Sequence, residues 1–186
     1  MKQTLDRTLA EHCGPLFYRK KPAALFPLAH DLLASEAFAR ALSHYGLVHA
    51  VLCDRADHAL LLVYHADMLQ AALSEPMAKR MLRKDGYPRQ GSIQAMLAHL
   101  RRRLCAERDF PHEIGLFLGY PAEDVLGFIE HKGQHCKHCG LWKVYGDVAQ
   151  AKALFAEYRQ CKQRALYHLE SGGSLFTLAQ ALGTAG

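Results

Sequence analysis

The sequence predicts an α/β mixed fold of the α+β type, in which a small mixed sheet of about four strands is covered by six to seven helices. Three observations predict it. Apolar residues recur at helical spacing over long segments, short apolar runs stand between polar turns, and glycine or proline occurs where segments end. The sheet should combine a hairpin with a later strand-helix-strand unit that makes a right-handed parallel crossover.

The first helix is expected over residues 4–13, where leucines recur on one face. Gly14 and Pro15 should end it, which places Cys13 at its C-terminal end. The prolines at positions 22 and 27 favour a mostly irregular stretch after it.

A second helix is expected over 28–45, and Gly46 stands where a helix commonly ends. Two apolar runs, 47–53 and 59–64, flank a polar insert of hairpin-loop length. They predict an antiparallel pair of strands. Two amphipathic helices should follow at 67–84, with a break at proline 76, and at 93–107.

The last third of the sequence predicts the strand-helix-strand unit. The run 113–119 is apolar with glycines and is interpreted as a short strand. A proline and two acids then open a helix over 121–132. A strand at 141–145, a long helix at 148–170 and a short helix at 175–182 complete the order.

The 186 residues are expected to form one domain, 1–186, with a weakly ordered tail at 172–186. Half of the residues are hydrophobic, which suits a globular core without disulfides. No apolar run has the length of a membrane span or a signal peptide, so we expect a cytoplasmic protein without a membrane partner. In that compartment the six cysteines should be thiols or ligands.

The formal charge of +5 does not by itself indicate a nucleic-acid partner. The three consecutive arginines at 101–103 spread over most of a helix circumference, and no nucleic-acid-binding motif accompanies them. We therefore expect a solvated helix surface there, and nucleic acid is not an expected partner.

A long signature runs through the second half of the chain and has counterparts near the N-terminus and in the last long helix. Its segments are Phe110–Pro121, Glu123–Val125, Gly127–Ile129, Cys139–Gly140, Trp142–Asp147, His12–Cys13, Lys21–Ala23 and Cys161. With these segments the sequence resembles the DUF3793 family over nearly its whole length. The resemblance implies kinship with a bacterial family of unknown function, and it assigns no reaction or ligand. A cysteine at position 139 is usual in that family, whereas Cys136 and the neighbouring histidines are particular to this chain.

The loop 131–139 indicates metal binding. Cys136 and Cys139 have the two-residue gap that lets both sulfurs face one ion, and histidines stand beside them. This loop would be half of a zinc or iron site, so distant residues would complete it. The candidate ligands are His12, Cys13, His135, Cys136, Cys139 and Cys161.

These residues lead to the first hypothesis, a cytoplasmic accessory protein that binds a metal, a cofactor or a partner through a Cys/His cluster. A histidine-rich surface loop with Cys139 packed inward is the alternative.

The second hypothesis is a small thiol-dependent, papain-like enzyme with Cys13 as nucleophile, His112 as base and Glu113 or another carboxylate as the group that orients the base. The C-terminal end of a helix raises the pKa of a thiol, so Cys13 would need a nearby histidine to form a thiolate. The partner in the first hypothesis, a small ligand or a protein, is left open by the sequence, as is the substrate in the second.

Overall fold

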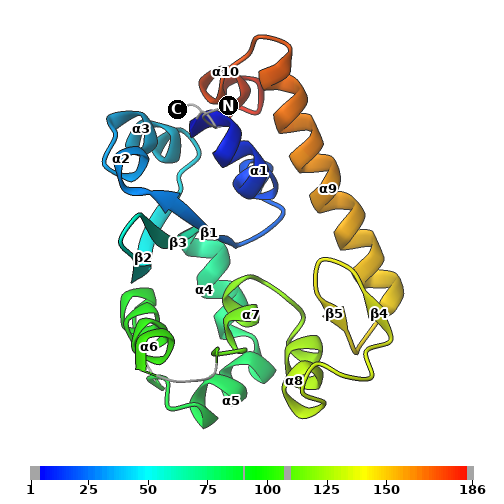
Figure 1. Ribbon diagram of the computed structural model, residues 1–186. Coiled ribbons are helices and arrows are strands. Elements are labelled where there is room, and N and C mark those ends of the chain that lie inside the picture. The colour runs from blue at the N-terminus through cyan, green and yellow to red at the C-terminus, as the bar shows by residue number, and fades with distance from the viewer. Residues whose placement is uncertain (1–4, 90, 107–109, 184–186) are drawn as a thin grey trace. The chain divides into compact units, whose positions relative to one another are not determined.

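The computed structural model describes residues 5–89, 91–106 and 110–183. These residues form two compact units whose elements are labelled in Figure 1. The first unit contains the described residues up to His65 and those from Glu157 onward, and the second contains the described residues from Ala66 to Ala156. Over the described residues the secondary structure is helical with two antiparallel sheets, one of three strands and one of two strands. The α+β class is confirmed, but the single mixed sheet is wrong.

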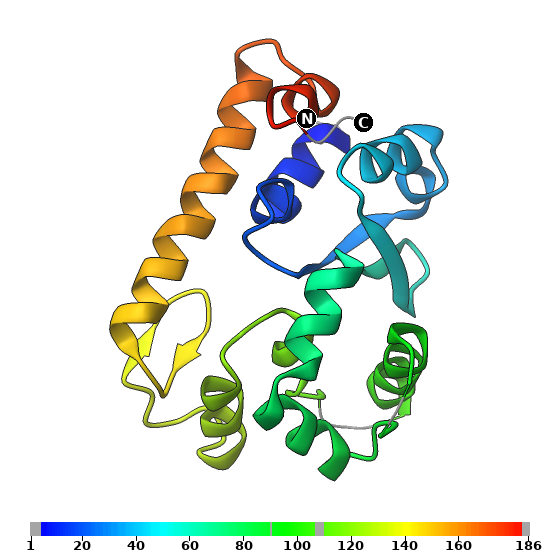
Figure 2. The ribbon, with the colours of Figure 1, turned by 180° about the vertical axis from the view of Figure 1, so that it is seen from behind.

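Three strands form the sheet of the first unit, β1 (Ala23–Ala29), β2 (Val48–Asp54) and β3 (His58–Tyr64). The strand order is β1-β3-β2 and both pairings are antiparallel, so β3 lies in the middle; Figure 2 shows this sheet from behind. The predicted hairpin of β2 and β3 is therefore confirmed.

Strand β1 corrects the prediction of an irregular stretch. Pro27 lies within the strand, opposite Leu60 of β3. A proline has no backbone N–H to donate, but an edge strand needs donors on one side only. Because β1 is at the edge of the sheet, Pro27 does not prevent it from pairing.

The helix expected at 28–45 begins later than predicted and is divided into α2 (His30–Leu33) and α3 (Glu36–His44). Ser35 caps α3, because its side chain accepts a hydrogen bond from the Phe38 N–H at 3.2 Å. The predicted end at Gly46 is confirmed. This glycine has φ +60°, and the following Leu47 N–H returns to the Leu42 carbonyl at 2.9 Å.

Helix α1 (Leu5–Phe17) continues through Gly14 and Pro15, which corrects the prediction that it ends after Cys13. A Cβ added at Gly14 would lie 2.7 Å from the Cα of Lys162, in the part of α9 (Val148–Glu170) that belongs to the first unit. Gly14 thus lets the two helix backbones touch. We infer that this packing outweighs the backbone hydrogen bond lost at Pro15.

The core of the first unit lies against one face of the sheet. Residues of α1, α3 and α10 (Leu175–Ala181) pack with alternate residues of β1 and β3. Its large and almost fully buried members include Leu9, Leu16, Phe26, Phe38 and Leu61. The Tyr45 hydroxyl donates to the Leu175 carbonyl at 2.8 Å and ties α10 to the end of α3. The short helix predicted near the C-terminus and the long helix α9 are confirmed.

Helices make up most of the second unit. They are α4 (Ala66–Ser74), α5 (Pro76–Lys84), α6 (Ile93–Ala106), α7 (Ile114–Phe117) and α8 (Ala122–Glu130). The break predicted at Pro76 is confirmed, and Glu75 caps α5 by accepting from the Ala78 N–H at 2.9 Å. No helix among the described residues combines the length and apolar character needed to cross a bilayer.

The strand predicted at 113–119 is wrong, because this segment forms the single helical turn α7. The Leu116 N–H donates to the Glu113 carbonyl at 2.9 Å, and the Leu118 N–H donates to the Ile114 carbonyl at 3.1 Å. Among the described residues of this unit, the strands are β4 (His138–Cys139) and β5 (Lys143–Val144), which form an antiparallel hairpin. The parallel crossover is therefore wrong as well.

Candidate thiol site

Two of the predicted ligand residues, Cys136 and Cys139, lie next to each other at the β4–β5 hairpin of the second unit. Their sulfur atoms are 3.0 Å apart and share a hydrogen bond. Cys139 is exposed and Cys136 is half-buried, so the alternative in which Cys139 packs inward is wrong. The hydrogen bond with Cys139 raises the pKa of Cys136, and the nearby charge of Lys143 opposes that rise.

The backbone before the hairpin is tightly folded. Lys132, Gly133 and His135 have positive φ angles of 50°, 72° and 57°. Such angles are uncommon for residues with a Cβ, so the surrounding contacts must hold them. The hairpin then begins with the Lys137 N–H, which donates to the Val144 carbonyl at 2.8 Å. This path brings two cysteines three residues apart onto one side of the loop.

Asp124 on α8 holds the hairpin in place. Its carboxylate accepts hydrogen bonds from the indole N–H of Trp142 at 2.7 Å, from the Tyr145 N–H at 2.7 Å and from the Gly146 N–H at 2.8 Å. The side chain is only 2% exposed, so these bonds replace its hydration. The sequence indicates an acid that complements the start of α8, and it misses this anchoring role because the donors follow 18 to 22 residues later.

Two glycines let aromatic rings pack against the hairpin. A Cβ at Gly140 would overlap the ring of Phe155, and a Cβ at Gly127 would overlap Tyr145. The Tyr145 hydroxyl also donates to the Gln134 carbonyl at 2.9 Å, directly before the thiol pair. Both glycines lie in the segments through which the sequence resembles the family.

The three histidines of the loop contact aromatic rings. His131 stacks on Tyr145 with ring centroids 5.6 Å apart, and the His135 ring lies 6.3 Å from the His131 ring. His138 lies 6.2 Å from the ring of Phe155. Within the described ranges, His, Cys, Asp and Glu form no group of three that could hold a metal ion. The pair that the fold does bring together is the two thiols.

The other predicted ligands, His12, Cys13 and Cys161, belong to the first unit. Cys13 is 0% exposed and Cys161 is 4% exposed, and burial raises the pKa of both thiols. They flank the contact between Gly14 and α9. Cys13 lies inside α1, so burial and not the end of a helix raises its pKa. His12 stacks on Phe26 at 4.7 Å, and burial lowers its pKa.

Lys21 is a residue of this neighbourhood that is not among the predicted ligands or catalytic residues. Its ammonium lies 5.8 Å from the centre of the Tyr158 ring. Burial lowers the pKa of Lys21 to about 8, and the negative charge of a Cys13 thiolate opposes that shift. The available signal was its place in the Lys21–Ala23 segment of the signature.

The residues of the enzyme hypothesis are divided between the units, with Cys13 in the first and His112 and Glu113 in the second. His112 is exposed, whereas Glu113 is 2% exposed and forms an ion pair with Arg103. The Tyr87 hydroxyl also donates to Glu113 at 2.9 Å. These contacts give Glu113 a structural role in its own unit. The hypothesis of a papain-like enzyme stays a prediction.

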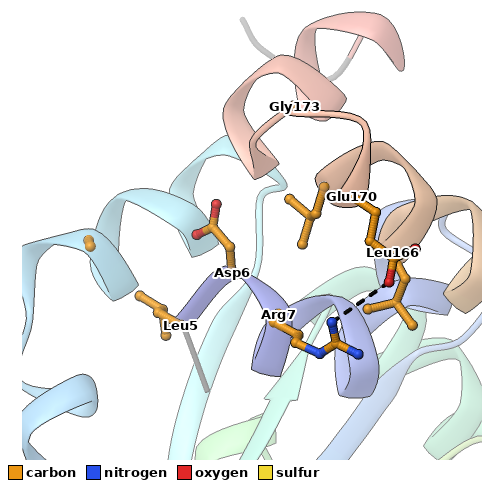
Figure 3. Close-up of a pocket in the computed structure, with 8 residues that line it drawn as sticks. Leu5, Asp6, Arg7, Leu166, Glu170 and Gly173 are labelled. Carbon is orange, nitrogen blue, oxygen red and sulfur yellow. Dashed lines mark ion pairs between the residues drawn. The ribbon is translucent and has the colours of Figure 1, made fainter. Parts of the chain in front are cut away.

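A pocket of about 410 Å³ lies in the first unit, and Figure 3 shows its lining. Leucines contribute its apolar part. Arg7 on its wall is paired with Glu170 at 3.7 Å and with Glu11 at 3.2 Å, so acidic side chains already neutralise its charge. The lining is Leu5, Asp6, Arg7, Ala37, Leu166, Leu169, Glu170 and Gly173, and none of the candidate ligands or catalytic residues is among them.

The fold and the site define a two-unit α+β protein with a solvent-facing thiol pair on an anchored hairpin. The family model of DUF3793, described as "Protein of unknown function (DUF3793)", matches residues 9–179. The chain therefore belongs to this family. Neither the curated proteins nor the solved structures gave a match.

Proposed function

We propose that the protein is a cytoplasmic accessory protein that binds a thiophilic metal ion, zinc or iron, through Cys136 and Cys139. The observation that carries this proposal is the 3.0 Å separation of the two sulfurs on a hairpin that Asp124 anchors. Both metals bind cysteine thiolates in proteins.

The thiol pair needs only a small adjustment to bind zinc. Two thiolates on one tetrahedral zinc ion stand about 3.8 Å apart, so the sulfurs would separate by less than an ångström. The exposed histidine beside them, His135, would have to turn toward the ion to supply a third ligand. The charge of Lys143 lowers the pKa of Cys136, but the hydrogen bond with Cys139 raises it by more, so a bound metal ion would have to displace the thiol proton.

The test is elemental analysis of protein purified without oxygen. About one zinc or iron per chain should copurify, and Cys136→Ser or Cys139→Ser should reduce it to background. Cys105→Ser is the matched control, because this cysteine is also exposed but lies on α6. Replacement of His135 by alanine should weaken binding by about tenfold. Folded protein without metal, or metal retained when both Cys136 and Cys139 are replaced, would contradict the proposal.

A further inference from the structure

We propose that the same thiol pair, when it holds no metal, carries out thiol–disulfide exchange with negatively charged disulfides, with Cys139 as the attacking thiol and Cys136 as the resolving thiol. The inference shares its residues with the proposed function but does not require that a metal binds.

The distance between the sulfurs carries the inference. At 3.0 Å the two atoms are in contact, and a disulfide bond of about 2.05 Å requires them to approach by about a further ångström. Neither cysteine lies within a helix, where the intervening backbone would resist that movement. The short separation lets the second thiol reach a mixed disulfide formed on the first.

Exposure determines the order of the two thiols. A disulfide must approach the attacking sulfur along the axis of its own S–S bond, which needs open space on the solvent side. Cys139 is exposed and Cys136 is half-buried, so an incoming disulfide reaches Cys139 first. Cys136 needs to reach only Cys139, which is already in contact with it.

The exchange is balanced in atoms and electrons. The Cys139 thiolate attacks one sulfur of the substrate, the substrate S–S bond breaks, and one thiolate leaves with the bonding pair. Cys136 then loses its proton to solvent and attacks the Cys139 sulfur, and the second substrate thiolate leaves. The protein dithiol is thus oxidised to a disulfide and the substrate disulfide is reduced to two thiols.

The charges of the hairpin indicate the class of substrate. Residues 131–146 contain three lysines and three histidines and no acid. The Lys143 ammonium donates to the Gly133 carbonyl at 2.6 Å and the Lys137 ammonium donates to the Gly146 carbonyl at 3.1 Å, which holds both charges on the hairpin.

Three acids near the hairpin accept hydrogen bonds from the chain, and Glu130, which directly precedes residue 131, is exposed. Asp124 is buried under the hairpin, Asp147 accepts from the Gln150 N–H at 3.0 Å, and Glu123 accepts from the Asp147 N–H at 3.4 Å. Within residues 131–146 every formal charge is positive, and this favours a disulfide with carboxylates, such as the disulfide of an acidic peptide.

The experiment uses metal-free protein with Cys53 and Cys105 replaced by serine, because these two are the other cysteines that are not buried. The dianionic probe is 3,3′-dithiodipropionate and the dicationic probe is cystamine, and each rate is divided by the rate of a small free thiol. With both cysteines present, mass spectrometry should show loss of two hydrogens and release of two substrate thiols. The Cys136→Ser protein should retain a mixed disulfide on Cys139. The Cys139→Ser protein should react with the probe at least about tenfold more slowly than the protein that has both cysteines.

Charge selectivity is tested by Lys137→Gln, which should reduce the normalised preference for the dianionic probe about threefold at low salt. The control is Lys152→Gln, an exposed lysine on α9 outside the hairpin, which should leave the preference unchanged. Faster reaction of the Cys139→Ser protein than of the Cys136→Ser protein would reverse the order and overturn the inference. Absence of the internal disulfide would overturn it too. Because no metal is present, these outcomes leave the elemental analysis as a separate test of the proposed function.

Discussion

The two groups of cysteines show how differently one residue type is used in this chain. Cys13 and Cys161 flank the contact of two helices in the first unit and are almost completely buried. Cys136 and Cys139 lie at a hairpin of the second unit in contact with each other, and Cys139 is exposed while Cys136 is half-buried. Burial turns a thiol into a small apolar side chain, whereas exposure beside a second thiol leaves it reactive. The environment, and not the presence of cysteine, identifies the chemical site.

The largest expected effect that sharpens this comparison is on the rate of alkylation. In native protein, iodoacetamide should modify Cys139 at least about a thousandfold faster than Cys13, because a buried thiol reacts only when its surroundings open. A short pulse of reagent followed by peptide mass spectrometry measures both rates. Comparable rates at the two positions would mean that the first unit opens far more readily than its packing indicates.

Asp124→Ala should remove the hydrogen bonds that hold the hairpin of Cys136 and Cys139 in place. It leaves the donors of Trp142, Tyr145 and Gly146 without their acceptor, so we expect a loss of about 3 kcal/mol in the free energy of unfolding. Urea unfolding followed by tryptophan fluorescence measures it, since Trp142 is the sole tryptophan. Glu130→Gln, an exposed acid on the same helix, is the control and should change stability by less than about 0.5 kcal/mol.

Serine substitutions compare the two groups directly. Cys13→Ser places a hydroxyl in an apolar site and should cost about 2 kcal/mol of stability. Cys139→Ser should cost less than about 0.5 kcal/mol, because water solvates the hydroxyl there. Paired thermal unfolding scans of the two variants test this difference, and equal costs would remove the distinction between the two groups.

Lys21 should make the free energy of unfolding depend on pH, and this smaller effect reports on the surroundings of Cys13. Burial lowers the pKa of Lys21 from 10.5 to about 8, so between these values the unfolded chain binds more protons than the folded chain. Stability should therefore rise with pH from about 8 to 10.5, and the gain should be lost as pH falls through that window. The gain at this partly exposed side chain should be about 1–2 kcal/mol. Lys21→Met should remove it, and an unchanged pH profile of urea midpoints in this variant would contradict the assignment.

Long helices and strand pairs with a regular pattern of apolar residues were predictable from the sequence. Helix α9 has 23 residues, enough to show a helical period, and the β2–β3 hairpin has two apolar runs around a polar loop. The turn α7 has four residues and all are buried, so its apolar run matches that of a buried strand. Strand β1 contains a proline, which a central strand would exclude. The local sequence does not show that this strand lies at an edge of the sheet, so the strand was not predicted.

In the candidate site, contacts between residues close in sequence were predictable and contacts between distant residues were not. The approach of Cys136 and Cys139 was predictable because two intervening residues define it. The roles of Asp124 and Lys21 were not, since their partners come from other parts of the chain. The predicted completion of the metal site by His12, Cys13 and Cys161 also depends on distant contacts, and it stays a prediction.

Pro27 has a further consequence for how the molecule behaves at high concentration. Strand β1 is one border of its sheet, and a foreign strand that adds there needs a continuous row of outward N–H and carbonyl groups. Pro27 removes one outward donor in the middle of that row, at an exposed position. The same residue that obscured the strand in the sequence therefore protects its border against self-association through added strands.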